Sequence, residues 1–173
     1  MAEERKGVIT FKGGPMTLVG PEVKVGDKAP DFKVLAAGLK ETTLKDSAGK
    51  VRLISVVPSV DTPVCELQTK RFNEEAAKLG DKYAVLTISM DLPFAQGRFC
   101  KSFSADKIQT LSDHRDASFG TNYGALIKEL RLLTRAVFVV GADDKVKYVQ
   151  YVKEVTDHPD YDKALNAAKT ANG

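Results

Sequence analysis

Continuous apolar runs alternate with segments of helical spacing along most of this chain. Three runs rich in Val, Ile and Leu cover residues 51–57, 83–89 and 134–140. Continuous apolarity is typical of strands that are covered on both faces, as in a largely parallel sheet. We therefore expect these three segments to form the centre of one β-sheet.

The stretch between the first two runs has the period of a helix. Residues 63–79 place apolar side chains along one stripe, formed by Val64, Leu67, Phe72, Ala76 and Leu79. Pro63 in the first turn and Gly80 just after the last are the usual start and stop signals of a helix. Similar spacing predicts three more helices, over residues 94–103, 115–123 and 160–171.

Shorter patterns complete the expected fold. Residues 8–11 and 16–19 flank a glycine-bearing turn and predict an N-terminal β-hairpin. Four further strands are predicted, over residues 29–35, 42–44, 108–111 and 145–152. The order of elements is thioredoxin-like, which means an α/β fold with a central mixed β-sheet flanked by helices, here with an added N-terminal β-hairpin.

Length and charge restrict the class of protein. The 173 residues fit a single domain spanning 1–173. The formal net charge of +3 comes from interspersed signs, which argues against a nucleic-acid partner. The charged start, residues 1–6, is unlike a signal peptide, and no apolar run approaches the ~20 residues that cross a bilayer. We expect a cytoplasmic protein with no membrane partner.

Cys65 is the first candidate for chemistry. It follows the strand over 51–57 and the loop from Pro58, about three residues into the next helix. The carboxyl end of a strand and the amino end of a helix are where an α/β sheet presents a group to a ligand. We interpret Cys65 as a nucleophile activated as a thiolate by the helix end. For a cysteine in an arbitrary helix, a buried structural role is the more common one.

Two residues of the loop before Cys65 are further candidates. Thr62 can place its hydroxyl beside the sulfur or bind an oxygen substrate, and it serves equally well as a plain N-cap. Pro58, with Pro63, restricts the loop and helps to exclude water; without the cysteine both are ordinary turn and helix-start prolines.

Arg135 and Cys100 are candidates for the rest of a thiol reaction. A thiolate that attacks a peroxide leaves charge on the second oxygen, which a guanidinium at Arg135 would stabilise. A solvent-facing arginine at a strand end is the commoner alternative. Oxidised Cys65 would be a sulfenic acid that condenses with a nearby thiol, for which Cys100 is available unless it is simple apolar filler. Forming that disulfide between two helices would loosen the turns that carry the cysteines.

At these residues the sequence resembles a known family. Pro58-x-x-x-Thr62-x-x-Cys65 is similar to the active-site signature of peroxiredoxins, and the segments 59–65 and 91–100 resemble the bacterial thiol peroxidase subfamily. The resemblance implies a peroxidatic Cys65, a resolving Cys100, and Thr62, Pro58 and Arg135 around the peroxide. It also implies hydrogen peroxide or organic hydroperoxides as substrate, an intramolecular disulfide, thioredoxin as reductant and a homodimer. No cofactor or metal is expected.

Four other classes of protein are alternatives to a thiol peroxidase. A dithiol reductase needs Cys-x-x-Cys, and Gln68 stands at the second position. A cysteine hydrolase needs a base, and His114 and His158 are more simply surface residues. A zinc module has four ligands in number but no short paired spacing. A chaperone or interaction protein remains open as a secondary role.

Overall fold

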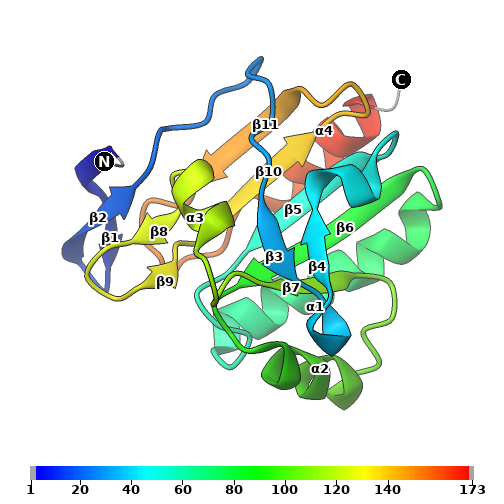
Figure 1. Cartoon of the computed structure of the whole chain (residues 1–173), viewed down its shortest axis with the longest axis horizontal. Coiled ribbons are helices and arrows are strands. Elements are labelled where there is room, and N and C mark those ends of the chain that lie inside the picture. The colour runs from blue at the N-terminus through cyan, green and yellow to red at the C-terminus, as the bar shows by residue number, and fades with distance from the viewer. Residues whose placement is uncertain (1–2, 172–173) are drawn as a thin grey trace.

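The computed structural model describes residues 3–171, and its larger sheet has parallel strands at the centre and antiparallel ones at both edges (Figure 1). Its strands are, in spatial order, β11 (Val146–Tyr151), β10 (Ala136–Val140), β5 (Val51–Val56), β6 (Tyr83–Ser89), β7 (Gln109–Ser112), β3 (Lys33–Leu35) and β4 (Glu41–Thr43). Only β5, β6 and β7 pair in parallel. The predicted mixed sheet is therefore confirmed, with the three apolar runs as β5, β6 and β10.

Helices cover both faces of this sheet. Alternate strand residues such as Leu53 and Val137 face α1 (Pro63–Leu79) and α4 (Tyr161–Ala171). Their neighbours in sequence face α3 (Ser118–Asn122) and the chain before β5. Helix α2 (Pro93–Ser102) lies against β7, and two short 3-10 turns, η1 (Ala37–Leu39) and η2 (Leu44–Ser47), flank β4. Because strand side chains alternate between the faces, continuous apolar runs suit a sheet covered on both.

A second, smaller sheet contains the N-terminal hairpin. Strand β1 (Glu4–Phe11) pairs with β2 (Gly14–Val19), β2 pairs with β8 (Leu126–Ile127), and β8 pairs with β9 (Leu132–Leu133), all antiparallel. The predicted hairpin is confirmed, although β1 also includes the charged residues before Val8. Strands β8 and β9 were not predicted, because two residues are too few to show a period. In Figure 1 this sheet lies beside one end of the larger sheet.

The buried face of α1 differs from the prediction. Ala76 and Leu79 pack against the core as predicted, but Leu67 is 55 % exposed. The fully buried side chains of α1 are Phe72, as expected, and Cys65, Gln68 and Thr69. These follow the i, i+3, i+4, i+7 spacing of one helix face. The prediction was wrong at Leu67, because two polar residues are buried on this face instead, and each has a partner: Gln68 Nε2 donates to Ser55 Oγ (2.8 Å), and Thr69 Oγ1 donates to the carbonyl of Cys65 (2.8 Å).

Smaller differences concern the ends of elements. The helix predicted over 115–123 is confined to α3, and Thr134 and Arg135 precede β10 rather than starting it. No helix in the described part of the chain is both long and apolar enough to cross a membrane.

Candidate active site

The geometry of the site starts where β5 ends. The chain leaves the sheet at Val57, passes the buried Pro58 and enters α1 at Pro63, which makes Cys65 the third residue of the helix. The Cys65 side chain is 0 % exposed and packs in an apolar cluster with Val57, Val60 and Phe99. The sequence-predicted position of the thiol, at a strand carboxyl end and a helix amino end, is what the structure has.

Arg135 is buried and directed at this thiol. Its side chain is 2 % exposed, which rules out the solvent-facing alternative. Nη2 donates to Cys65 Sγ (3.3 Å), Nη1 to Gln68 Oε1 (2.9 Å) and Nε to the carbonyl of Val155 (2.7 Å). All three guanidinium nitrogens are thus engaged, so the charge is held in one orientation in a site with little access to water.

Gln68 is a site residue that sequence reasoning missed. It accepts from Arg135 and donates to Ser55 on β5, so it connects the guanidinium to the central sheet. In the sequence, Gln68 stands out only as the residue at the second position of a Cys-x-x-Cys spacing. Its spacing of three residues from Cys65 puts both on the same face of α1, which is the signal that could have found it.

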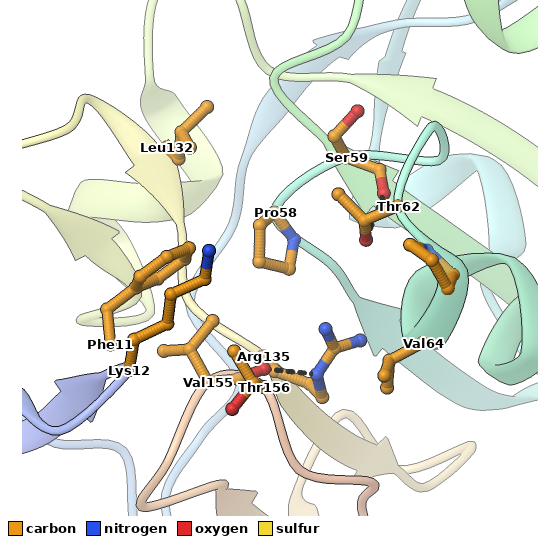
Figure 2. Close-up of a pocket in the computed structure, with 11 residues that line it drawn as sticks. Phe11, Lys12, Pro58, Ser59, Thr62, Val64, Leu132, Arg135, Val155 and Thr156 are labelled. Atoms are coloured by element: carbon orange, nitrogen blue, oxygen red, sulfur yellow. Dashed lines mark hydrogen bonds between the residues drawn. The ribbon is translucent and has the colours of Figure 1, made fainter.

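A cavity of about 330 Å³ opens beside Arg135 (Figure 2). Its size lies at the lower end of the range for small-molecule pockets. Eleven residues line it: Phe11, Lys12, Pro58, Ser59, Thr62, Pro63, Val64, Leu132, Arg135, Val155 and Thr156. They come from the hairpin, the loop before α1, the first turn of α1, β9, the residue before β10 and the segment after β11. The predicted Pro58, Thr62 and Arg135 therefore border one space, and Cys65 lies buried behind it, in contact with Arg135.

Thr62 does not act as an ordinary side-chain cap. It occupies the N-cap position of α1, but its side chain makes no capping hydrogen bond. Instead Oγ1 donates to the carbonyl of Ser59 (3.3 Å), and the residue is exposed at the cavity. The hydroxyl is consequently available to a molecule in the cavity.

Asp91, also missed from the sequence, fixes the loop that precedes the thiol. Ser59 Oγ donates to its Oδ1 (2.8 Å), while the backbone N–H of Val60 (2.8 Å) and Ser89 Oγ (2.6 Å) donate to Oδ2. Asp91 lies between β6 and α2, so this one carboxylate joins the segments that carry the two cysteines.

Cys100 lies in the last turns of α2 and packs on the same apolar cluster as Cys65. The side chain is half-buried, with Sγ 3.9 Å from Thr110 Oγ1, and burial raises the pKa of its thiol. Both cysteines are free. The structure thus brings Cys100 to the cluster around Cys65 without joining the two sulfurs.

Glu154 holds the wall of the cavity opposite α1. Its carboxylate accepts from Thr10 Oγ1 and the backbone N–H groups of Lys12 and Gly13 on the hairpin. It also accepts from the backbone and hydroxyl of Thr156. These hydrogen bonds, led by the one from the Thr156 backbone, lower the pKa of Glu154 to about 2. The hairpin tip and the segment after β11 are therefore held together by one charge.

Residues required by the rival classes do not gather here. His158 is exposed and its Nδ1 lies 2.7 Å from the hydroxyl of Tyr161, and neither histidine lines the cavity. Across residues 3–171 no group of three or more His, Cys, Asp or Glu side chains is placed to hold a metal ion. Cys65, Cys100 and the two histidines therefore do not form the zinc site that was weighed as an alternative.

Known proteins resemble this chain over nearly its whole length. The Redoxin family matches residues 24–165. A thiol peroxidase of Halalkalibacterium halodurans is 66% identical over 94% of this chain and 98% of its own length. One of Bacillus subtilis is 63% identical over 93% and 96%.

Solved structures agree with the fold. A peroxiredoxin-like protein from Aquifex aeolicus has a TM-score of 0.89 at 43% identity and covers 98% of both chains. A thiol peroxidase from Chromobacterium violaceum has a TM-score of 0.83 at 20% identity over 95% of this chain and 96% of its own, and shows the fold alone.

A buried thiol at the start of a helix on a thioredoxin-like sheet defines a class of thiol-dependent oxidoreductases. The chain belongs to the redoxin family and, within it, to the bacterial thiol peroxidases of the peroxiredoxin type. It is accordingly an enzyme, a peroxidase that uses a thiol.

The lowered pKa of Glu154 predicts a specific dependence of stability on pH. Since the folded-state pKa of about 2 is below the ordinary glutamate value of 4.5, the carboxylate contributes stability above about pH 4.5 that is lost as pH falls towards 2. The free energy of unfolding of Glu154→Gln should therefore lie below that of the wild type at neutral pH, and the gap should close through this window. Chemical denaturation across the window measures it.

A matched control removes one negative charge elsewhere. Glu74→Gln alters an exposed glutamate of α1 that does not touch the hairpin. A gap for Glu154→Gln that stays constant from neutral pH to pH 2 would contradict the assignment.

Proposed function

We propose that this protein reduces hydrogen peroxide and organic hydroperoxides with Cys65 as the peroxidatic residue. The observation that carries the proposal is the contact of 3.3 Å between Arg135 Nη2 and Cys65 Sγ beside a cavity lined mainly by apolar side chains. A guanidinium donor beside sulfur favours the thiolate, which is the form that attacks. The cavity gives a peroxide, with or without an alkyl chain, a place next to that donor.

In the first step the Cys65 thiolate attacks the terminal oxygen of the peroxide. A sulfur–oxygen bond forms as the oxygen–oxygen bond breaks, so the sulfur is oxidised to a sulfenic acid and the peroxide is reduced to water or an alcohol. The departing oxygen carries the electron pair and then takes up a proton. We assign Arg135 to stabilise this charge, Thr62 to hydrogen-bond the peroxide and Pro58 to exclude water from the thiol.

In the second step Cys100 resolves the oxidised thiol. Its sulfur attacks the Cys65 sulfenic sulfur, a disulfide forms within the chain, and the oxygen leaves as water. The pKa of Cys100 is raised by burial, which keeps its thiol protonated while α2 is folded. Unwinding the end of α2 would expose Cys100 and return its pKa towards the ordinary value. The same opening would therefore bring the two sulfurs together and activate the Cys100 sulfur for attack.

The proposed reaction also needs a reductant for the disulfide. A thioredoxin dithiol supplies the two electrons and two protons that return both cysteines to thiols. We propose that residues 1–173 act as one domain in a homodimer in the cytoplasm, without a cofactor, serving antioxidant defence and redox homeostasis. The high identity to bacterial thiol peroxidases over almost the whole chain supports this setting.

Thiol titration tests the two cysteine roles. One equivalent of hydrogen peroxide should remove both free thiols of the dilute wild type without crosslinks between chains. Cys65→Ser should consume no peroxide. Cys100→Ser should complete one turnover and accumulate a sulfenic acid, which dimedone traps. Persistence of two free thiols in the wild type would overturn the proposal.

The role of Arg135 is tested by Arg135→Met. Loss of one donor to a developing charge should lower kcat/KM for hydrogen peroxide by about 10²-fold, as removing a single oxyanion donor does in other enzymes. Arg131→Met, which alters an exposed arginine nearby, is the matched control. Circular dichroism checks the fold of both variants, and a folded Arg135→Met with unchanged kcat/KM would remove Arg135 from the mechanism.

Local opening is tested through Asp91. Asp91→Ala removes the acceptors of Ser59 and of the Val60 backbone, and each hydrogen bond to a charged group contributes about 1.5–3 kcal/mol. Amide exchange at Val60 should therefore rise at least about tenfold, and the disulfide should form faster after peroxide addition.

Asp61→Ala is the control, since Asp61 is an exposed carboxylate in the same loop. In the wild type, oxidation should raise exchange in the first turn of α1 and in the end of α2. Equal protection in the reduced and oxidised proteins would mean that no opening is needed.

A further inference from the structure

The cavity beside Arg135 has an uneven distribution of charge. Of its eleven lining residues, two are cations, Arg135 and Lys12, and none is an anion. The remaining nine are apolar or carry only hydroxyl groups. The cavity therefore combines an apolar interior with positive charge at two separate places.

The two cations differ in whether they have partners. Arg135 uses all its nitrogens on Cys65, Gln68 and the Val155 carbonyl. The amino group of Lys12, in contrast, makes no ion pair or hydrogen bond with any residue in the range 3–171. Lys12 thus brings an uncompensated positive charge to the rim of an apolar space.

The backbone of Lys12 is held firmly although its side chain is exposed. Lys12 sits in the hairpin turn with a φ of 50°, and its N–H donates to Glu154 Oε2 (3.2 Å). In Figure 2 its side chain extends past Phe11, and its amino group points towards the space bordered by Pro58 and Leu132. The Glu154 carboxylate does not line the cavity, and both of its oxygens accept hydrogen bonds from the hairpin and Thr156.

We propose that Lys12 binds the carboxylate of anionic organic hydroperoxides, so that fatty-acid hydroperoxides are preferred over their neutral esters. The hydroperoxide end would lie at Thr62 and Arg135, the alkyl chain would cover the apolar lining, and the carboxylate would meet Lys12 at the rim. A purely apolar substrate gains nothing from this cation, whereas a carboxylate gains a charge-assisted hydrogen bond beside low-polarity side chains. The inference rests on the proposed peroxidase function and specifies the substrate of the same site.

The test compares one fatty-acid hydroperoxide, kept below its micellar concentration, with its methyl ester. For the wild type, kcat/KM should be higher for the acid. Lys12→Gln should lower kcat/KM for the acid by about three- to thirtyfold. The lower figure applies to an exposed charge contact and the higher one to a partly desolvated contact. The kcat/KM values for the ester and for hydrogen peroxide should not change. Lys12→Arg should retain the preference, and Lys12→Glu should reverse it.

Lys6→Gln is the matched control, because Lys6 is an exposed lysine on the same hairpin that does not line the cavity. An equal loss in Lys6→Gln would point to general attraction by net charge and overturn the proposal, as would an acid-to-ester ratio that Lys12→Gln leaves unchanged.

A binding experiment separates this inference from the proposed function. Dodecanoate, which has no peroxide group, should bind the Cys65→Ser protein in calorimetry, and the Cys65→Ser, Lys12→Gln double variant should bind it about three- to thirtyfold more weakly. Failure of the wild type to reduce any peroxide would reject the proposed function. Normal peroxide reduction with equal dodecanoate affinity in both variants would reject only the role of Lys12.

Discussion

The buried guanidinium of Arg135 is the constraint on which the site depends. A charge removed from water is costly unless it is hydrogen-bonded, and all three nitrogens of Arg135 donate, to acceptors on two separate parts of the chain. One donor fixes Cys65 and one fixes Gln68, both on α1. The third fixes the carbonyl of Val155 after β11. The face of α1 that carries Cys65 and Gln68 therefore faces the protein, and Leu67 is left in solvent.

The small sheet becomes part of the site through the same segment. Val155 accepts from Arg135, and its neighbour Glu154 holds the hairpin tip, so the segment after β11 links the thiol to Phe11 and Lys12. The hairpin, which looks like an accessory to the sheet in sequence, thereby forms one wall of the cavity. Residues from opposite ends of the chain meet because Glu154 takes its partners from the hairpin, and Arg135 then connects the same segment to α1.

The sequence predicted the parts of this arrangement that have a local signal. Apolar runs, the proline and glycine at the ends of α1, and the loop before Cys65 all lie within a few residues of what they specify. Gln68, Asp91 and Glu154 were not predicted, because their role lies in partners far along the chain: 67 residues separate Gln68 from Arg135, and 31 separate Asp91 from Val60. The burial of Arg135 was likewise undecided until the acceptors around it were known.

The proposed reaction makes two opposed demands on the site: the thiol must be held in place for the peroxide and must later move towards Cys100. Different hydrogen bonds bear on each demand. Arg135 and Gln68 join the Cys65 thiol to the central sheet, which holds it in one orientation. In the proposed second step, the oxidised Cys65 has to leave that position to reach Cys100. Asp91 opposes this movement through the loop and not through the sulfur, because it binds Ser59 and Val60 but not Cys65. In the proposed mechanism, oxidation converts Cys65 to a neutral sulfenic acid, which would weaken its contact with Arg135 at the step that requires Cys65 to move towards Cys100.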